Sequence, residues 1–434
     1  MIALLRALGL SLVRFFYPSI RASGLSRLPS TPTIVLANHP NGMLDPVVLR
    51  LALNRPLAFL AKSTLFGNPL GRAMMRAFDA IPVYRPRDGS DTSRNQATFA
   101  QCHALLAEGR HLALFPEGTS HSDPMLRPLK TGAARIALGA TEAQARGLSI
   151  LPVGLLYEDK NVFRSRVAVA VGEPISLAPF IAQAQTDERA AVEALTAAID
   201  AALSAVVLEA DSAELWQGLL AVAGWTRPEC AADLTLREAH ARKLARAYAA
   251  LSAASPEQAE GVVTATRRYA RMLRALHIAD PFSVEAPPPV HPVSLLGPMV
   301  LLAPIALCGA LLGWPAYRFT GLIARRLAGT ETDLIGTFKA LGGALFLYLY
   351  WLAESVVAFH FGGAYWAFAL LLVAPLSGYT ALRYSERLSL RRETLRAWAI
   401  GANGARIARA LQSRRVELTE QVERALAAVP DLPA

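Results

Sequence analysis

Charged residues, cysteines and a cleavable leader pattern are all scarce in this sequence. Asp, Glu, Lys and Arg make up only 18% of the 434 residues, whereas hydrophobic residues make up 53%. This balance is too apolar for an ordinary soluble enzyme. The three cysteines, Cys102, Cys230 and Cys308, are far apart and odd in number. They predict neither a disulfide framework nor a cysteine metal cluster, which fits a reducing compartment.

The first residues are apolar but lack the pattern of a signal peptide. Arg6 and Arg14 interrupt the stretch from Met1 to Tyr17, and no small-residue cleavage site follows it. The stretch is also short for a membrane span. We therefore expect residues 1–29 to hold a helix that lies in the membrane interface. A core helix of the following domain is the alternative.

Positive charge is in excess, with a formal net charge of +10. A basic and apolar chain favours contact with an anionic lipid surface. Because no nucleic-acid-binding motif is present, we expect no nucleic-acid partner. A plain compositional bias toward arginine is the alternative explanation.

Residues 30–176 alternate strand-like and helix-like segments. The strand candidates are the apolar runs at 33–37, 57–61, 112–115, 150–156 and 167–171. The helix candidates lie between them, at 68–78, 91–108 (after Ser90 and Asp91, which suit an N-cap) and 130–146. This alternation predicts an α/β domain in which helices flank a mostly parallel sheet. Four residues fall at or just beyond such strand ends and could converge there: His39, Arg85, Glu117 and Pro152.

The rest of the chain is predicted to be helical. Residues 177–285 are rich in alanine and carry apolar residues at three- and four-residue spacing. A Pro-rich linker follows at 286–291. Residues 292–384 form a predicted membrane domain with three apolar blocks of near-spanning length, at 293–313, 340–360 and 365–382. A basic helical tail occupies 385–434.

Prolines and charge set the expected membrane topology. Pro298 and Pro304 interrupt the first apolar block, which predicts a broken, re-entrant helix. The segments flanking 340–382 are both rich in arginine, so both are expected on the cytoplasmic side. Two crossings joined at Phe361-Gly362-Gly363 satisfy this rule. We expect an integral protein of the bacterial inner membrane whose catalytic domain is cytoplasmic.

A histidine and an aspartate follow the first predicted strand. His39 comes shortly after the run at 33–37, and Asp45 lies six positions later. Asp45 could accept a hydrogen bond from one ring nitrogen, leaving the other to take a proton from a substrate hydroxyl. Six positions turn about 600° along an ideal helix, so the pair would not share a helical face. With Pro40 and Gly42 between them, we expect a loop leading into a helix. A capping or core histidine is the alternative.

Three further motifs follow this pair in chain order. They are Ile81-Pro82-Val83-Tyr84-Arg85, Phe115-Pro116-Glu117-Gly118-Thr119-Ser120 and Ile150-Leu151-Pro152-Val153-Gly154. The four blocks together resemble those of the glycerolipid acyltransferase family, which includes glycerol-3-phosphate and lysophosphatidate acyltransferases. The family motif most often has four residues between His and Asp, whereas here there are five. This longer spacing resembles the branch of yeast-type glycerol-3-phosphate/dihydroxyacetone-phosphate acyltransferases.

The resemblance implies roles for particular residues. His39 would be the base and Asp45 would orient it. Arg85 and Lys130 would hold the acceptor phosphate, because Arg suits a bidentate grip and Lys supplies a point charge. Glu117 and Gly118 would shape the acceptor pocket, with Glu117 bonding a glycerol hydroxyl or holding Arg85. Weaker candidates are Asn38, Thr119, Arg127, Pro152 and Arg164.

The implied activity is transfer of a fatty acyl group to glycerol 3-phosphate or dihydroxyacetone phosphate in phospholipid biosynthesis. The donor would be acyl-CoA or acyl carrier protein, with membrane lipids as further partners and with no metal and no bound cofactor. A lysophosphatidate or other lysophospholipid acceptor is one alternative. An inactive, lipid-binding membrane scaffold is another. No G-x-S-x-G elbow accompanies Thr119 or Ser120, which disfavours a serine hydrolase.

Overall fold

The computed structural model describes residues 1–427 apart from 86–88, 90, 143–144, 146, 286–291 and 404. The chain divides into two compact units. The first comprises Met1–Trp216 and Thr330–Ala340, and the second comprises Gln217–Gly329 and Leu341–Ala434. The predicted linker at 286–291 and the proposed cap residue Ser90 lie outside the described residues.

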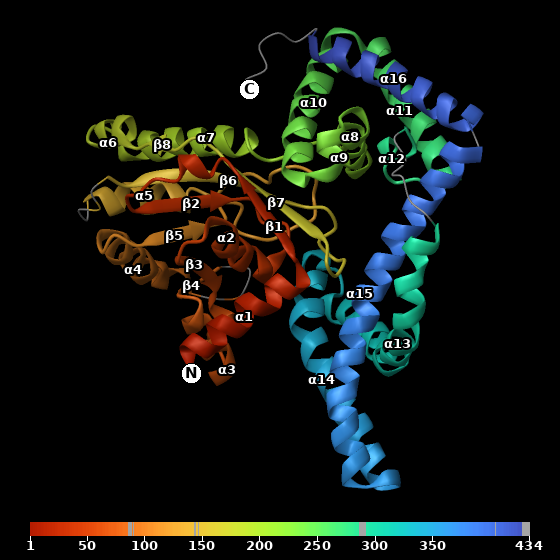
Figure 1. Ribbon diagram of the computed structural model, residues 1–434. Helices are drawn as coiled ribbons and strands as arrows, with labels where there is room; N and C mark the ends of the chain where they lie inside the picture. Colours follow the sequence, from red (N-terminus) through yellow and green to blue (C-terminus); the bar gives the residue numbers. More distant parts are fainter. Residues whose placement is uncertain are drawn as a thin grey trace. The chain divides into compact units, whose positions relative to one another are not determined.

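The first unit is organised around one sheet (Figure 1). Its strands are β1 (Ser19–Ser23), β2 (Thr33–Ala37), β3 (Leu57–Lys62), β4 (Ala80–Val83), β5 (His111–Leu114), β6 (Ser149–Tyr157), β7 (Arg166–Val171) and β8 (Ile175–Ser176). They are ordered β1-β7-β6-β2-β5-β3-β4, and β8 pairs with β6. β6 is antiparallel to β7 and β8, and the other pairings are parallel. The predicted α/β class is confirmed.

Helices cover both faces of this sheet because successive residues of a buried strand point to opposite sides. Ile34 and Leu36 of β2 join a core with buried residues of α4 (Asn95–Ala107), α5 (Gly132–Glu142) and α7 (Glu188–Ser204). Val35 and Ala37 join a second core with α1 (Ile2–Phe16), α2 (Asp45–Leu53) and α3 (Pro69–Ala77). The short α6 (Ala178–Ala184) precedes α7. Every residue of β2 is buried, which explains its uninterrupted apolar sequence.

The five predicted strands are present with nearly the predicted bounds, but the sequence reading missed three others. β1 has no fully buried residue and lies at the sheet edge, so it shows no apolar run. β4 contains Pro82 and is the opposite edge strand, where a missing N–H is tolerated. β8 has only two residues. The sheet therefore starts at Ser19, before residue 30, where we expected the domain to begin.

Helix α1 combines both expectations for the N-terminal segment. Val13 and Phe16 are buried in the second core, as a core helix would be. Leu4 and Leu8 on the same helix are 63% and 57% exposed. An apolar exposed face is typical of a helix that contacts a membrane interface, and that position stays a prediction.

The second unit is helical in the part of the chain that the structure describes. Its helices are α9 (Pro228–Ala232), α10 (Leu234–Ala254), α11 (Pro256–Leu276), α12 (Phe282–Glu285), α13 (Pro292–Ala328), α15 (Ala364–Asn403) and α16 (Ala405–Ala427). α8 (Ala213–Thr226) and α14 (Ile335–Gly362) each contribute residues to both units. The chain leaves helical geometry at Ser255 because it precedes Pro256, and proline disfavours the helical region for the residue before it.

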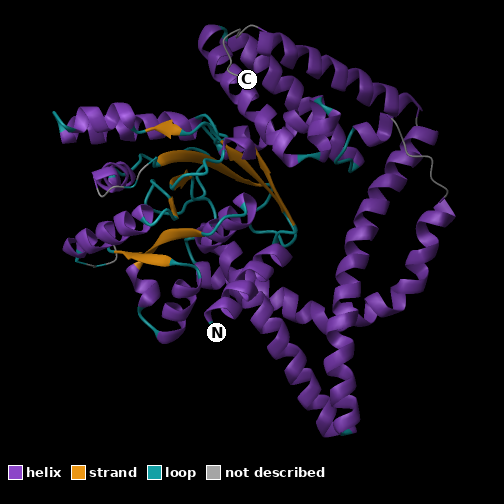
Figure 2. Ribbon diagram, turned by 60° about the vertical axis from the view of Figure 1, so that its left-hand side comes forward, coloured by secondary structure: helices purple, strands orange, loops and turns teal. Residues whose placement is uncertain are grey.

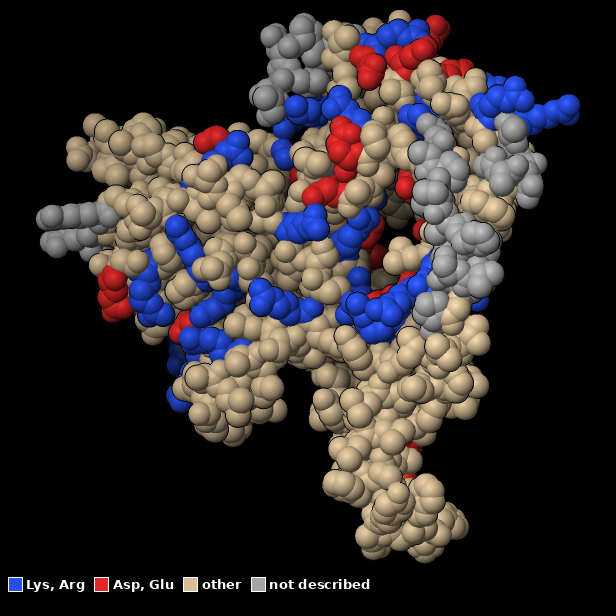
Figure 3. All heavy atoms as spheres, viewed as in Figure 1, with Lys and Arg blue, Asp and Glu red and all other residues tan. Residues whose placement is uncertain are grey.

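Three helices are long and apolar enough to cross a membrane, over Met299–Ala328, Thr332–Gly362 and Ala364–Ile400. α14 and α15 meet at Gly363, whose φ of 79° suits glycine, so the turn lies where the sequence predicts it. Figure 3 shows that the tip formed by these two helices, at the bottom of the view, is covered almost entirely by uncharged residues. The first apolar block differs from expectation.

That first block is not broken. α13 is a continuous helix of 37 residues, although Pro304 and Pro315 lie within it. Figure 2 shows that its axis bends along its length, as proline inside a helix requires. The predicted interruption is therefore wrong, because bending accommodates the missing donors without ending the helix.

Residues 330–340, here called the 330–340 segment, belong to the first unit although they follow α13. The segment contains a 3-10 turn, η6 (Thr332–Leu334), and the first residues of α14. The Thr332 and Ser122 hydroxyls lie 2.9 Å apart. Lys339 Nζ donates to the Asn161 carbonyl at 2.7 Å. These contacts hold the segment against the loops that follow β5 and β6.

Candidate active site

His39 and Asp45 form a hydrogen-bonded pair just beyond the end of β2. A 3-10 turn, η2 (Gly42–Leu44), follows His39, and α2 begins at Asp45, as the predicted loop into a helix requires. His39 Nδ1 lies 2.8 Å from Asp45 Oδ2. The imidazole also stacks on Phe115, with ring centroids 3.9 Å apart. Both contacts fix the plane and direction of the ring.

Asp45 is completely buried but well supplied with donors. The Asn41 amide donates to Oδ2 at 2.7 Å, and the Tyr157 hydroxyl donates to Oδ1 at 2.6 Å. With His39 Nδ1 as a third donor, both oxygens are satisfied. A donor at Nδ1 leaves Nε2 of a neutral imidazole with a lone pair. No residue that the structure describes hydrogen-bonds Nε2, so it can accept a proton from a bound hydroxyl.

A second layer of polar groups supports Asp45 from the core. Asn41 Nδ2 donates to the Tyr17 hydroxyl at 2.7 Å, which in turn donates to the Lys160 carbonyl at 2.5 Å. Burial, and then the nearby charge of Asp45, raise the pKa of Tyr157 well above its usual value. Tyr157 therefore stays a neutral donor to the carboxylate. Burial likewise raises the pKa of Tyr17.

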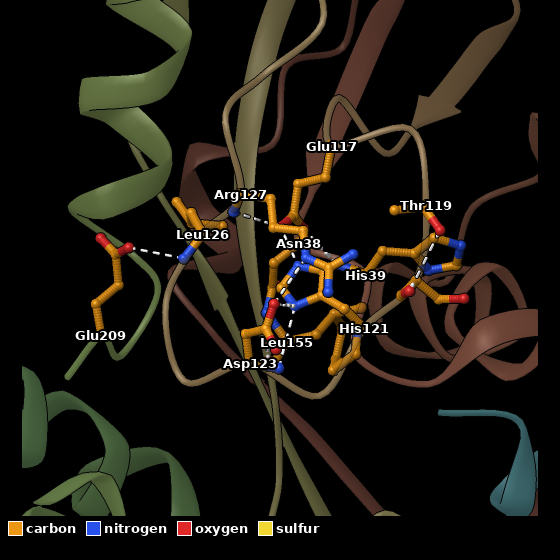
Figure 4. A network of polar contacts seen from close by, with 12 residues as sticks. Asn38, His39, Glu117, Thr119, His121, Asp123, Leu126, Arg127, Leu155 and Glu209 are labelled. Carbon is orange, nitrogen blue, oxygen red and sulfur yellow. Dashed lines mark hydrogen bonds and ion pairs between the residues drawn. The ribbon is translucent and has the colours of Figure 1, made fainter. Parts of the chain in front are cut away.

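Glu117 has a different place from the one predicted. Its side chain is 0% exposed. Oε1 accepts from the His39 amide at 3.0 Å, and Oε2 accepts from the Arg127 amide at 2.9 Å and contacts His121 Nε2. With both oxygens occupied and buried, the predicted contact with an acceptor hydroxyl or Arg85 is wrong. Glu117 instead ties its own loop to the backbone of His39 (Figure 4).

Asn38 joins the end of β2 to β6. Its Oδ1 accepts from the Leu155 amide at 2.7 Å, and its Nδ2 donates to the Leu155 carbonyl at 3.0 Å (Figure 4). The side chain thus replaces a backbone partner where the β2–β6 ladder ends. These two bonds hold the backbone just before His39 in place. Both polar atoms of the Asn38 side chain are therefore used within the fold.

Arg85 and Lys130 both lie beside Gly118. Arg85 Nη1 donates to the Gly118 carbonyl at 3.3 Å. The Lys130 side chain packs on Gly118, where an added Cβ would lie 3.4 Å from Lys130 Cγ. Gly118 has a φ of 74°, which explains the glycine. Two cations that come from different elements therefore converge near the turn that follows β5, as an anion site would require.

The weaker candidates have mixed positions. Arg127 pairs its side chain with Asp123 at 2.7 Å, and its amide supports Glu117. Thr119 Oγ1 lies 3.4 Å from the Ser120 carbonyl. Arg164 has a φ of 67° and donates its amide to the Phe16 carbonyl in the loop between β6 and β7. Pro152 is inside β6 rather than at its end, because the strand continues to Tyr157; its predicted place at a strand end is wrong.

Several residues of the site were missed from the sequence: Asn41, Phe115, His121, Tyr157 and Lys160. Asn41 and Phe115 lie inside the recognised motifs, so their place in the chain was a usable signal. Tyr157 and Lys160 lie beyond the fourth motif and carry no local pattern. Among the described residues, no group of three potential metal ligands converges. The arrangement offers proton transfer and anion binding.

Known proteins provide an independent comparison. Residues 19–156 match the family described as Acyltransferase. The chain is 41% identical over 86 residues to glycerol-3-phosphate O-acyltransferase 2 of Saccharomyces cerevisiae, covering 20% of this chain and 11% of that protein. It is 32% identical over 164 residues to the lyso-ornithine lipid O-acyltransferase of Pseudomonas aeruginosa, covering 37% and 52%. A chloroplastic 1-acyl-sn-glycerol-3-phosphate acyltransferase of Arabidopsis thaliana is 32% identical over 149 residues, covering 33% and 38%.

The chain thus spans about half or less of the length of these relatives. Among solved structures, the 1-acyl-sn-glycerophosphate acyltransferase of Thermotoga maritima is 20% identical with a TM-score of 0.32, covering 45% of this chain and 80% of that one. Residues 19–156 thus match an Acyltransferase domain, and the curated relatives that are similar to this chain are named as glycerolipid acyltransferases.

Proposed function

We propose that this protein transfers a fatty acyl group from a thioester, acyl-CoA or acyl carrier protein, to the hydroxyl of a phosphorylated glycerol. Glycerol 3-phosphate and dihydroxyacetone phosphate are the favoured acceptors, with lysophosphatidate as the alternative. The observation that carries the proposal is the His39–Asp45 pair at 2.8 Å, with Nε2 available as a base. The relatives named as glycerol-3-phosphate and 1-acylglycerol-3-phosphate acyltransferases support the acceptor class.

The proposed step needs no acyl-enzyme. His39 Nε2 takes the proton of the acceptor hydroxyl as its oxygen attacks the thioester carbonyl. A new C–O bond forms, the C–S bond breaks, and the imidazolium returns its proton to the leaving thiolate. Asp45 stabilises the imidazolium that exists between these events and keeps the ring oriented. The three donors to Asp45 keep it in place while the charge on His39 changes.

Arg85 and Lys130 are the proposed acceptor-binding cations. Both contact Gly118, in the loop whose Glu117 holds the His39 amide. A phosphate held there would be linked by one short loop to the base. Two cations suit the negative charge of a phosphate-bearing acceptor.

The test is a panel of acceptors offered to the purified full-length protein in detergent. Glycerol 3-phosphate, dihydroxyacetone phosphate, lysophosphatidate and lyso-ornithine lipid would each be combined with acyl-CoA or acyl carrier protein thioester, and the His39→Ala variant is the control. We expect His39-dependent acylation of a phosphorylated acceptor. If none of the acceptors is acylated, the inactive lipid-binding scaffold is the better description.

We also propose that α13 does not cross the membrane, whereas α14 and α15 do. The residues before and after α13, 1–216 and 330–340, share one compact unit and must therefore lie on one side of a membrane. Among the described residues, α13 holds the single candidate span between these two parts. It must then enter and leave on the same side. The basic flanks of the α14–α15 pair favour the cytoplasmic side.

The packing of α13 supports this proposal. A Cβ on Gly309 would lie 1.9 Å from the Ser377 carbonyl, and a Cβ on Gly343 would lie 3.0 Å from Thr320 Cγ2. At 1.5 Å rise per residue, Ser377 is roughly 20 Å and Gly343 roughly 30 Å from the turn at Gly363. These two contacts of α13 therefore lie roughly 20 Å or more away from the turn at Gly363.

Single cysteines at exposed positions test the topology. Thr330→Cys, Phe361→Cys and Arg406→Cys would be made in a background without native cysteines and probed on intact cells with an impermeant thiol reagent. We expect labelling of Phe361→Cys alone, and of the other two only after permeabilisation. Labelling of Thr330→Cys from outside would mean that α13 crosses.

A further inference from the structure

We propose that the 330–340 segment positions the active-site loop, defined as residues 39–45, through Gly336 and through a bridge made by Lys160. This inference rests on the proposed function of His39 and Asp45. It adds to the site a segment almost 300 residues away in sequence that none of the four motifs includes.

Gly336 is in direct contact with the layer that supports Asp45. A Cβ at this position would lie 2.6 Å from Asn41 Oδ1 and 2.7 Å from the Lys160 carbonyl, with the Tyr17 hydroxyl at 3.4 Å. These neighbours are a buried side chain and a carbonyl that already accepts a hydrogen bond. Asn41 belongs to the active-site loop, and the Lys160 carbonyl holds the Tyr17 hydroxyl that bonds Asn41. The second residue of α14 must therefore be a glycine for α14 to start here.

Lys160 forms the bridge between this segment and the loop. Its Nζ donates to the Pro40 carbonyl at 2.5 Å and to Ser122 Oγ at 2.7 Å. Ser122 Oγ in turn lies 2.9 Å from Thr332 Oγ1. One ammonium thus connects the residue directly after His39 to the 330–340 segment. Burial lowers the pKa of Lys160, and the nearby Asp45 carboxylate opposes that shift.

Leu334 of the 330–340 segment packs against Gly42 of the active-site loop. A Cβ on Gly42 would lie 2.7 Å from Leu334 Cδ2, and Gly42 has a φ of 49°. Pro40, Asn41 and Gly42 are therefore each contacted by this segment or by the Lys160 bridge. All three lie between His39 and Asp45, so the position of the pair depends on this packing.

The effect on catalysis would pass through Asn41. Its amide donates to Asp45 Oδ2, the same oxygen that His39 bonds. Pushing Asn41 away would therefore loosen the orientation of His39. A misplacement of about 1 Å in a catalytic group can lower the rate about 10²-fold. The acceptor cations Arg85 and Lys130 lie in two other loops, outside residues 39–45, so acceptor binding should change little.

The test compares two glycines of the same helix in the full-length protein. Gly336→Ala places a methyl group against Asn41, whereas a Cβ at Gly342 meets nothing within 4 Å. Both changes add the same helix-favouring residue. We expect Gly336→Ala to lower kcat about 10- to 100-fold with the acceptor KM within about threefold, and Gly342→Ala to keep wild-type kinetics.

A second variant and a second measurement do not depend on the glycine. Lys160→Met removes the bridge while keeping most of the side-chain length, and should lower kcat in the same way. Combined with Gly336→Ala, its loss should be smaller than the product of the two single losses, because both act through one loop. Hydrogen–deuterium exchange of residues 38–45 should be about tenfold faster in both variants and unchanged in Gly342→Ala.

The exchange measurement separates this inference from the proposed function. If the wild-type protein acylates no acceptor but exchange at 38–45 rises as expected, the proposed function fails and the contact stands. Wild-type kcat and wild-type exchange in both Gly336→Ala and Lys160→Met would overturn the inference. Equal losses in Gly336→Ala and Gly342→Ala would overturn it too, because the effect would then belong to α14 in general.

Discussion

Tyr157→Phe is the sharpest test of how the His39–Asp45 pair is held. The Tyr157 hydroxyl donates to Asp45 Oδ1 at 2.6 Å in a fully buried setting. Phenylalanine keeps the ring, which packs against Tyr17 with centroids 5.2 Å apart, and removes only the O–H. The change therefore deletes one donor to the carboxylate and leaves the packing almost as it was.

The size of the effect follows from the kind of bond. Hydrogen bonds to charged groups contribute about 1.5–3 kcal/mol, which corresponds to roughly 10- to 150-fold in rate. Asp45 keeps the His39 and Asn41 donors on its other oxygen. The loss should therefore stay below the ~10²–10⁴-fold expected for removing a general base. Because Asp45 is buried behind His39, the loss should appear in kcat and leave the acceptor KM unchanged.

The assay is steady-state acylation of the best acceptor from the panel, with thermal unfolding of each variant as a check on folding. Tyr248→Phe, the same chemical change in the second unit, is the matched control and should be neutral. A Tyr157→Phe variant with wild-type kcat would show that the Oδ1 contact does not orient Asp45. A raised acceptor KM at normal kcat would show that Tyr157 contributes to acceptor binding and not to the orientation of His39 and Asp45.

Three further predictions cover the base, the acceptor and pH. His39→Ala should lower turnover ~10²–10⁴-fold without loss of folding, and Asp45→Asn should lose less because the imidazole remains; both are read as kcat. Arg85→Ala should raise the KM for the phosphorylated acceptor about 10- to 150-fold, for one charge-assisted contact of about 1.5–3 kcal/mol, and a change in donor KM alone would reassign it. Burial, and then the Arg227 charge, lower the pKa of His240 to about 4 from 6.5, so the unfolded state binds more protons between these values and stability falls as pH drops through them. The loss reaches about 3 kcal/mol, and His240→Gln should flatten it in urea unfolding at pH 7 and 4.5.

The sequence was most informative where a residue's own neighbours determine its structure. β2, β6 and β7 are buried on both faces, so their apolar runs reveal them directly. The His39–Asp45 contact was also predictable, because a loop this short can bring the side chains at its two ends within hydrogen-bonding distance. The edge strands β1 and β4 were not, since half-exposed residues leave no uninterrupted apolar run.

Burial of a polar side chain was the feature that the sequence did not reveal. Glu117 was expected at the acceptor because the family resemblance implies that it shapes the acceptor pocket. In the fold its side chain is buried and contacts the backbone amides of His39 and Arg127 and the His121 ring. A buried carboxylate needs several donors, and here those donors come from two backbone amides and one imidazole. Almost every residue carries a backbone amide, so the spacing of residue types could not predict which amides would bond Glu117.

The donors to Asp45 follow from topology rather than from spacing. β2 pairs with β6 in a register that sets Ala37 beside Val153, so the residues of β6 beyond Val153 lie beside the chain that leaves β2. Alternate positions share a face of a strand, and Val153, Leu155 and Tyr157 all join the core that also contains α2. Once the strand order is known, Tyr157 is therefore the residue of β6 placed to reach the first residue of α2. A contact spanning 112 positions becomes predictable at that point, because strand order supplies the proximity that the sequence alone does not contain.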